Sequence, residues 1–165
     1  MFQDLTAKHS YDTGTESIVS LIINYPPTRI IALMQASNQL WKLSQYDLNS
    51  NKLITEHAIE GTYILSQTIK QDTTGTRFGL TYLDDGEFHF MMCDLEDKLF
   101  DFNINKHFGI DNETMPIKGF YNPFVLFCFI DNCTKAFITF FQRKNLTQYH
   151  FMFDIKAQKP CSELI

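Results

Sequence analysis

Short apolar runs separated by polar turns follow one another along most of the chain. The stretch TRFGLTYLDDGEFHFMMCDLEDKL, from Thr76 to Leu99, contains two such runs around an Asp-Gly pair. Successive side chains of a strand point to opposite faces, and both sets in the second run are apolar: Phe88, Phe90 and Met92 on one side, and Met91, Cys93 and Leu95 on the other. An antiparallel sheet commonly keeps one polar, solvated face. The pattern therefore predicts a hairpin strand that is buried on both faces.

The same pattern occurs three times along the chain. Segments that begin at Thr28, Thr76 and Thr134 each open with Thr and a basic residue, pass through an apolar run and a polar turn, and end on Asp followed by Leu or Ile. The basic residues are Arg29, Arg77 and Lys135, and the closing triplets are Tyr46-Asp47-Leu48, Cys93-Asp94-Leu95 and Phe153-Asp154-Ile155. A further apolar run precedes each Thr, and a candidate strand follows each Asp. We therefore expect an all-β fold of about three antiparallel four-stranded units.

The repeat also predicts how the chain is organised. We expect an N-terminal extension at residues 1–16, followed by one repeat domain at residues 17–165. The units of that domain are expected at about residues 17–61, 62–104 and 124–165, with an inserted loop at residues 105–123. Helix signals are weak, and a short helix is expected only in the extension or in the inserted loop.

Burial on both faces, combined with four-stranded units, resembles the repeats of β-propellers over roughly residues 17 to 165. The resemblance concerns the pattern alone, because the chain has neither the GH and WD pairs of WD repeats nor the Gly-Gly pair of kelch repeats. It implies that the units pack against one another as blades. Three blades do not close a ring, because propellers typically have four to eight. The resemblance therefore implies a second chain, a larger assembly or a longer protein.

A β-trefoil or another β-barrel is the alternative fold. A trefoil also contains three four-stranded units, and NQLWKL, from Asn38 to Leu43, is similar to the QxW element of ricin-type trefoil lectins. The other two units have EFHFMM and TQYHFM at this place. The trefoil alternative therefore depends on a single element around Trp41.

Composition narrows the classes of partner. The chain has 14 basic and 19 acidic residues, a net charge of -5 and no run of Lys or Arg, so nucleic acid and anionic membranes are disfavoured as partners. The longest apolar run, from Pro123 to Ile130, is too short to span a bilayer. No apolar leader-like segment opens the chain, and the four cysteines form no CxxC pair. We therefore expect a soluble, cytoplasmic protein with reduced thiols.

Catalytic motifs are missing from the sequence. It contains no GxSxG, P-loop, GxGxxG or HExxH pattern, and His89, Cys93 and His150 are the residues that we would nominate for any chemical role. The recurring Asp47, Asp94 and Asp154 are interpreted as structural, because a carboxylate there can accept N–H groups of the following turn. We predict no catalytic group, no cofactor and no metal site.

Turn chemistry agrees with the predicted hairpins. Asp85-Gly86 suits the positive φ angles of a type I′ turn, and Asn49-Ser50-Asn51 supplies residues that tolerate the left-handed conformation. Turns of this kind join antiparallel strands directly, so each predicted unit is a meander.

The leading functional hypothesis is a non-enzymatic protein-interaction or scaffold module that associates with itself or with a protein partner. Interfaces are enriched in aromatic residues, and the candidate binding residues are Trp41, Tyr46, Phe120 and Tyr121. One alternative is a glycan-binding lectin that uses Trp41 with Asn38 or Gln39. A second alternative is an enzyme whose site is built on the β repeat.

Overall fold

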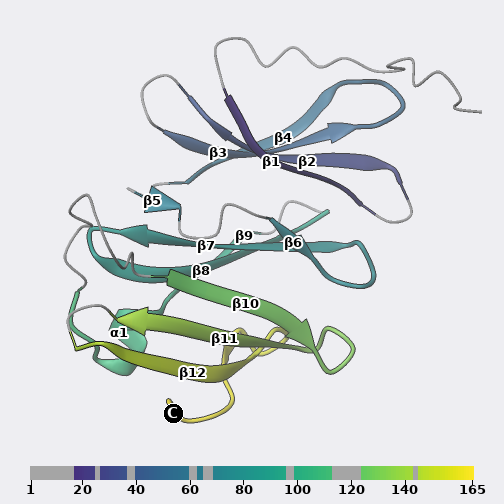
Figure 1. Ribbon diagram of the computed structural model, residues 1–165. Helices are drawn as coiled ribbons and strands as arrows, with labels where there is room; N and C mark the ends of the chain where they lie inside the picture. The colour runs from purple at the N-terminus through teal and green to yellow at the C-terminus, as the bar shows by residue number, and fades with distance from the viewer. Residues whose placement is uncertain are drawn as a thin grey trace, which may run out of the picture.

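The computed structural model describes residues 17–24, 27–36, 40–59, 63–64, 69–95, 99–112, 124–142 and 145–165, which form three antiparallel sheets stacked in chain order (Figure 1). Sheet 1 consists of β1 (Ser17–Ile23), β2 (Arg29–Gln35), β3 (Trp41–Asp47) and β4 (Leu53–Ile59), in that order. Sheet 3 consists of β10 (Phe124–Ile130), β11 (Lys135–Gln142), β12 (Thr147–Asp154) and β13 (Lys159–Pro160), in that order. None of the described sheets closes into a barrel. The all-β prediction with three four-stranded units is confirmed, and the trefoil and barrel alternatives do not describe this fold.

Sheet 2 has the strand order β5-β7-β8-β9, and its first strand is divided into two pieces. The full strands are β7 (Arg77–Asp84), β8 (Glu87–Asp94) and β9 (Leu99–Asn103), and the pieces are β5 (Tyr63–Ile64) and β6 (Lys70–Gln71). β5 pairs with Tyr82 and Leu83 of β7, whereas β6 pairs with Phe78 and Gly79 further along the same strand. Both pieces therefore occupy the position that β1 and β10 occupy in the other sheets.

Backbone hydrogen bonds confirm that the three repeated segments are equivalent. The N–H of Leu48 donates to the carbonyl of Thr28 at 3.0 Å, that of Leu95 to Thr76 at 3.1 Å, and that of Ile155 to Thr134 at 3.0 Å. The residues that follow these threonines pair across the hairpin with the closing aspartates: Arg29 with Asp47, Arg77 with Asp94, and Lys135 with Asp154. The similar Thr-to-Asp spacing of the three segments therefore reflects one pairing at the base of each hairpin, which is used three times.

In sheets 1 and 2, a side-chain oxygen accepts the backbone N–H groups at the start of the second strand, and the sequence analysis missed this feature. The Oδ1 of Asn24 accepts the N–H groups of Thr28 and Arg29 at 2.9 and 2.6 Å. In sheet 2, Oδ1 of Asp72 accepts the N–H groups of Thr76 and Arg77 at 3.1 and 3.3 Å. These side chains satisfy backbone donors that the turn would otherwise leave without a partner.

The third unit uses a tighter version of this turn. Thr134 donates through its hydroxyl to the carbonyl of Asp131 at 2.8 Å and to its Oδ2 at 3.3 Å. Asp131, Asn132 and Cys133 all have φ angles between 51° and 61°. Lys135 lies 3.1 Å from the Asp131 carboxylate. A hydrogen bond and the charge of Lys135 lower the pKa of Asp131, and the same contact raises the pKa of Lys135.

The other turns also have the conformations that the sequence predicts. Asp85 and Gly86 have φ angles of 44° and 80°, which suits the type I′ hairpin between β7 and β8, and Asn51 has a φ of 58°. Asp47 accepts the N–H groups of Asn49 and Ser50 at 3.0 and 2.6 Å. In sheet 3, Asp154 accepts the N–H of Ala157 at 2.7 Å. The structural role predicted for these two aspartates is therefore confirmed.

Side chains of sheet 2 pack on both sides, as the alternation predicts. Phe88, Phe90 and Met92 of β8 belong to a core shared with sheet 3, where Phe90 contacts Phe127 and Phe153 with ring centroids 5.0 and 5.6 Å apart. Met91 and Cys93 belong to a second core, which includes Ile31, Leu33 and Leu43 of sheet 1. Leu95 is partly buried and packs against that second core. The two apolar layers hold the three sheets together.

One short helix, α1 (Ile104–Phe108), follows β9, begins at the last residue of the predicted second unit and continues into the predicted inserted loop. Asn103 caps it by accepting the N–H of Lys106 at 2.9 Å. Asn105, which is 2% exposed, accepts the N–H of Phe88 at 2.8 Å and donates to the carbonyl of Asp111 at 3.0 Å. Asn105 therefore holds the helix and the residues that follow it against strand β8. Residues 1–16 and 113–123 lie outside the described residues, and the domain boundaries predicted there stay predictions.

Gly79 allows sheets 2 and 3 to approach closely, and this contact predicts the effect of a small substitution. A Cβ at position 79 would lie 2.7 Å from the ring of Phe127, which is itself packed between Phe90 and Phe129. Gly79→Ala should therefore destabilise the fold by about 1–3 kcal/mol, the usual cost of overpacking a core. Urea unfolding should be measured for Gly79→Ala, for Phe127→Leu and for the double variant. We expect leucine at position 127 to recover part of the unfolding free energy that Gly79→Ala removes. Strictly additive effects would contradict this contact.

The turn after β3 makes a prediction about pH. Hydrogen bonds from Ser50, first from its backbone N–H, lower the pKa of Asp47 below its ordinary value of 3.8, and the charge of Arg29 adds a smaller effect. A lowered folded-state pKa stabilises the fold above pH 3.8, and this contribution is lost as the pH falls through the folded-state pKa. NMR titration should give a raised Asp47 pKa in Ser50→Ala and a smaller rise in Arg29→Gln. The reverse order would show that charge, not hydrogen bonding, controls this carboxyl.

Candidate interaction surface

Strand register shows that all three sheets are stacked in the same sense. We call the face that holds the second, fourth and sixth residues after each repeated Thr the trailing face, and the opposite one the leading face. The trailing-face residues of the second strands are Ile30, Ala32 and Met34 in sheet 1, Phe78, Leu80 and Tyr82 in sheet 2, and Ala136, Ile138 and Phe140 in sheet 3. Those of sheet 2 pack toward sheet 1, and those of sheet 3 pack toward sheet 2. The stack therefore ends in the trailing face of sheet 1 and the leading face of sheet 3.

The trailing face of sheet 1 exposes large apolar side chains along β1. Ile18, Leu21 and Ile23 are 48%, 47% and 49% exposed. Their cross-strand partners on β2 are Met34, Ala32 and Ile30, which are already buried within the chain. Strands β3 and β4 make the same face more polar, because Lys42 on β3 forms an ion pair with Glu56 on β4 at 3.1 Å. The free apolar part of the face is therefore strand β1, with Leu53 on β4 also exposed.

The residues of β10 that correspond to the exposed residues of β1 are buried, because a preceding sheet covers them. Register places Val125 opposite Phe140, and Phe127 opposite Ile138, on β10. These positions correspond to Ile18 and Leu21 of β1, yet Val125 is 0% and Phe127 2% exposed, because sheet 2 covers them. The repeat therefore provides an internal reference for the first strand: it is covered in sheet 3, where a preceding sheet exists, and exposed in sheet 1, where none does, although Ile30, Ala32 and Met34 of β2 are buried.

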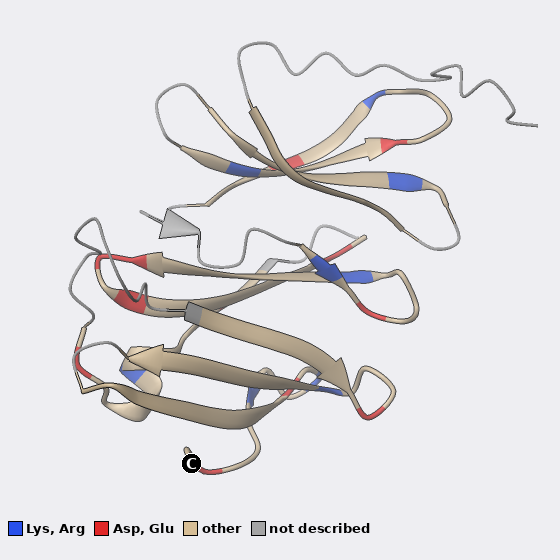
Figure 2. Ribbon diagram, in the orientation of Figure 1, with Lys and Arg blue, Asp and Glu red and all other residues tan. Residues whose placement is uncertain are grey.

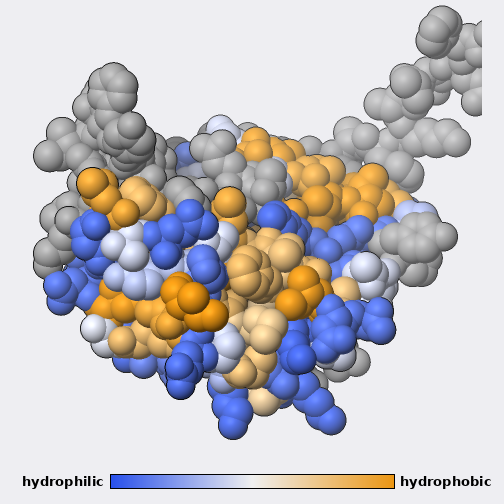
Figure 3. Space-filling view, turned by 60° about the horizontal axis from the view of Figure 1, so that its bottom comes forward, coloured by the Kyte–Doolittle hydropathy of each residue, from blue (hydrophilic) through white to orange (hydrophobic). Residues whose placement is uncertain are grey.

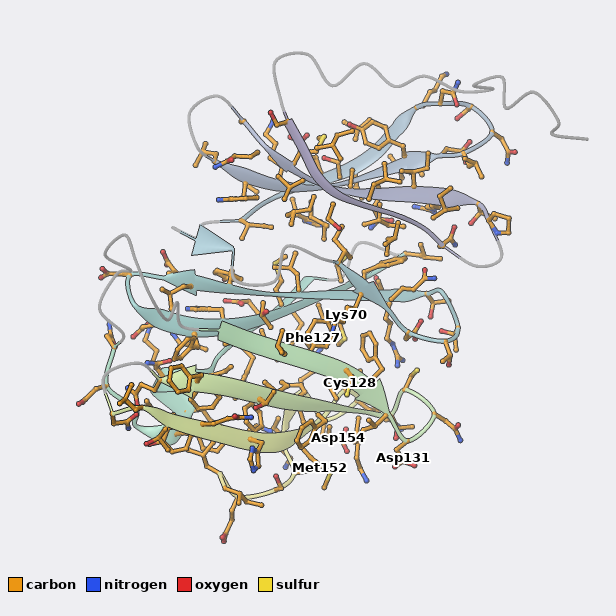
Figure 4. The ribbon with its side chains drawn as sticks, in the orientation of Figure 1. Lys70, Phe127, Cys128, Asp131, Met152 and Asp154 are labelled. Atoms are coloured by element: carbon orange, nitrogen blue, oxygen red, sulfur yellow. The ribbon has the colours of Figure 1, made fainter. Side chains whose placement is uncertain are left out.

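The leading face of sheet 3 is the second open surface. Leu126 of β10 is 47% exposed and Phe137 of β11 is 37% exposed, and Cys128 is exposed beside them. Together with Lys70 and Thr139 they line a pocket of about 210 Å³. Figure 3, which brings the bottom of Figure 1 forward, shows hydrophobic side chains among polar ones on this side of the molecule. Figure 4 places Cys128 and Met152 on the outermost sheet.

Polar groups connect sheets 2 and 3 near their first strands. Lys70 donates to the carbonyl of Phe127 at 2.6 Å and lies 5.4 Å from the centre of its ring (Figure 4). Thr81 donates to the carbonyl of Val125 at 2.9 Å. Arg77 donates to the carbonyl of Cys133 at 3.3 Å. These bonds pair carbonyls of β10 and its turn with side chains of the preceding sheet, so they set the relative position of the two sheets.

Charged residues are placed mainly around the sheet ends and turns, whereas the middle parts of most strands carry neither sign (Figure 2). Sheet 1 is an exception, because Lys42 and Glu56 lie on its strands. The exposed apolar side chains of β1 and β10 therefore face solvent without charged neighbours on their own strands. Exposed apolar side chains that gather on one face often mark a contact with another molecule.

The structure describes two of the four predicted binding residues, Trp41 and Tyr46. Trp41 is partly buried and packs against the core between sheets 1 and 2. Tyr46 is 8% exposed, and its hydroxyl lies 3.9 Å from the sulfur of Met34. Phe120 and Tyr121 lie outside the described residues, as do Asn38 and Gln39. Both described aromatics contribute to packing, and the binding role stays a prediction for all four candidates.

The three residues nominated for chemistry do not meet. His89 lies on the trailing face of sheet 2, with Nδ1 2.9 Å from the carboxylate of Asp101 and its ring stacked on Tyr82. Cys93 is on the same face but 1% exposed, within the core. His150 lies on the leading face of sheet 3, opposite Thr139. A nucleophile and its base must lie within hydrogen-bond reach, and these residues do not form such a pair.

Cavities and metal ligands give no stronger site within the described residues. A pocket of about 150 Å³ between sheets 2 and 3 is lined by Arg77, Met92, Cys93, Asp94, Phe100, Ile155 and Gln158. The described residues contain no group of three or more His, Cys, Asp or Glu side chains able to hold a metal ion. None of the four cysteines forms a disulfide. The exposed apolar side chains on the outer faces of sheets 1 and 3, the terminal faces that a stack of three blades leaves uncovered, are therefore the best candidate site.

Comparisons with known proteins add no assignment. No protein-family model matches the chain, and no curated protein sequence matches it. Among the described residues, no helix is long and apolar enough to cross a membrane. The expected cytoplasmic location stays a prediction.

Thr81 tests whether polar bonds position sheet 3 on sheet 2. Its side chain is fully buried, and Thr81→Val keeps the shape but leaves the Val125 carbonyl without this donor. Loss of a buried partner typically costs about 1–3 kcal/mol, and Thr81→Ser should recover most of it. Thr139→Val is the matched control, because Thr139 occupies the equivalent place on the leading face of sheet 3 but is only partly buried and donates to the carbonyl of Tyr149 within its own sheet, at 3.1 Å. Chemical unfolding should show a larger loss for Thr81→Val than for Thr139→Val. Equal losses would contradict a positioning role.

Proposed function

We propose that this protein is a non-enzymatic interaction or scaffold module that binds another polypeptide through the open faces at the two ends of its sheet stack. Its sheets are then blades of the β-propeller type, and the chain supplies part of a larger ring. The observation that carries this proposal is the contrast within the repeat. Ile18 and Leu21 are about half exposed, whereas Val125 and Phe127, at equivalent positions, are buried under the preceding sheet.

The energetics favour covering these residues. Burying a large aliphatic or aromatic side chain contributes about 1.5–3 kcal/mol, and both end faces expose several such side chains. The sheets are stacked in one sense, so a sheet added to the leading face of sheet 3 can use the geometry that joins sheet 3 to sheet 2. On sheet 1, the exposed surface is strand β1, because Ile30, Ala32 and Met34 beside it are already buried.

The separation of His89, Cys93 and His150 supports the non-enzymatic part of the proposal. Two of them lie on the trailing face of sheet 2, and the third lies on the leading face of sheet 3. A catalytic group acts through close contact with its partners and substrate. The apolar end faces, by contrast, have the features of protein interfaces.

Site-specific photo-crosslinking tests the proposed function. A photoreactive amino acid at position 21 or 126 samples the two end faces, and one at exposed position 156, in the turn after β12, is the matched control. In cells that express the full chain, we expect positions 21 and 126 to give a discrete covalent adduct with one identifiable protein, either another copy or a different polypeptide. Position 156 should give none. Equal labelling at all three positions, or no adduct at positions 21 and 126, would overturn the proposal.

A further inference from the structure

Strand β1 lies at the edge of sheet 1, where it pairs with β2 on one side only. The N–H of Asn24, next to β1, donates to the carbonyl of Arg29 at 3.1 Å, so this pair is hydrogen-bonded. Pairs of an antiparallel ladder alternate between hydrogen-bonded and non-hydrogen-bonded, which places Ile23 and Leu21 in non-hydrogen-bonded pairs. Their backbone N–H and C=O groups therefore point away from β2. The described residues provide no hydrogen bond to these outward groups.

The equivalent edge groups of the other two sheets are bound by the sheet that precedes each of them. Strand register places Ile69 of sheet 2 and Phe127 of sheet 3 where sheet 1 has Leu21. The N–H of Ile69 donates to the hydroxyl of Ser20 in sheet 1 at 3.3 Å. The carbonyl of Phe127 accepts from Lys70 in sheet 2 at 2.6 Å. No sheet precedes sheet 1 in the described part of the chain, so Leu21 has no such partner there.

The exposed apolar surface of sheet 1 is confined to this edge strand. Ile18, Leu21 and Ile23 are about half exposed. The neighbouring side chains of β2 and β3 on the same face are at most 8% exposed: Ile30, Ala32, Met34 and Tyr46. A sheet stacked over this face would need those side chains to be open. A strand added beside β1 would instead contact the residues that are exposed.

Strand β1 also lacks the features that usually protect the edge of a sheet. Edge strands of soluble proteins often carry charges or Pro, or are very short, and SIVSLII contains neither a charge nor Pro. On the opposite edges, β4 contains Glu56, β9 contains Asp101, and β13 has only 2 residues. The edge carbonyls of β10 are bound by Lys70 and Thr81. The edge of β1 is therefore the one that remains available among these strands.

Building on the proposed function, we propose that β1 is a docking edge for an extended segment of a different protein, which adds one further strand to sheet 1. The outward N–H and C=O groups of Leu21 and Ile23 repeat with the spacing of a strand, and the backbone of an extended segment offers donors and acceptors with the same spacing. Cross-strand neighbours of these two residues are then apolar, because apolar side chains pair favourably across a ladder. The added segment therefore carries β-branched or aromatic residues at alternate positions and no charge beside β1.

The shape of β1 favours a strand of different sequence over a second β1. Its register shifts between Ile18 and Ser20, which is a β-bulge or a similar irregularity, and a bulge disrupts the ladder locally. Two copies of β1 that paired along their whole length about a two-fold axis would run antiparallel. The regular end of each copy, at Leu21 and Ile23, would then face the irregular end of the other. A strand of another protein can keep a regular ladder along Leu21 and Ile23.

Selection of short peptides tests the docking edge. A phage-displayed library of short random peptides is panned against the purified full chain, and the enriched peptides are measured against Leu21→Pro and Leu21→Val. Proline removes the outward N–H and is tolerated on edge strands, whereas valine, the matched control, keeps it. We expect affinity for Leu21→Pro to fall about tenfold, because one backbone hydrogen bond is lost, and affinity for Leu21→Val to stay near that of the wild-type chain. Circular dichroism verifies that both variants fold. Equal binding to all three chains, or no enriched peptide, would overturn the proposal.

Amide hydrogen exchange, followed by NMR, tests backbone pairing without a substitution in the chain. With an enriched peptide at about ten times its Kd, the N–H groups of Leu21 and Ile23 should exchange about tenfold more slowly. The N–H of Ile22 points toward β2 and should change little. N-methylation of the peptide on the edge that faces β1 should abolish this protection, and N-methylation on its other edge should not. Unchanged exchange at Leu21 and Ile23 would overturn the proposal.

Two outcomes would assign the edge to this chain itself, and either would overturn the proposal. Sedimentation velocity that gives dimers of the wild-type chain and monomers of Leu21→Pro would identify a second copy as the occupant. A photoreactive amino acid at position 21 of the purified chain that labels residues 1–16 of the same molecule would identify that segment as the occupant.

A further outcome separates the docking edge from the proposed function. In this outcome, position 21 or 126 gives a photo-adduct with a different protein, but the amides of Leu21 and Ile23 exchange at the same rate with and without that protein. This result would overturn pairing at the edge of β1 and leave the interaction module in place.

Discussion

Apolar side chains extend from sheet 2 in both directions, and this two-sided packing is the constraint on which the other contacts depend. Phe90 reaches the core shared with sheet 3, while Met91, its neighbour in sequence, reaches the core shared with sheet 1. A sheet with two apolar faces is stable in water only when both are covered. Sheet 2 obtains both covers from its own chain. Sheets 1 and 3 are each covered by sheet 2 on one face, and the exposed apolar side chains of β1 and β10 lie on their outer faces.

The order of the faces depends in turn on strand register. A slip of one residue would move every apolar side chain to the opposite face, so three sheets can stack in one sense only if each hairpin keeps the same register. The bond between Thr28 and Leu48 is repeated at equivalent positions in both other sheets. Asn24 and Asp72 hold the preceding turns through their side-chain oxygens. The repeated polar residues therefore determine which apolar residues face which neighbour, although they contribute little to the core.

Alternation and the Thr-to-Asp spacing were sufficient to predict the hairpins, because both features are local. The divided first strand of sheet 2 was not predictable in this way, since YILSQTI was interpreted as one strand. The contact of Gly79 with Phe127 joins distant parts of the chain and leaves no local signal. Trp41 was nominated from residue type alone, and its strand position places it against the core. Face assignment by register, rather than aromatic content, would have identified β1 and β10 as the open strands.

In the contact between sheets 2 and 3, hydrogen bonds and apolar packing occur at different places. Close to the first strands, Lys70 and Thr81 bind carbonyls of β10, and the apolar rings lie behind them. A backbone carbonyl is present whatever the side chain, so these bonds can recur in any sheet pair with the same register. Specificity must then come from side-chain volume, as in the pairing of Gly79 with Phe127.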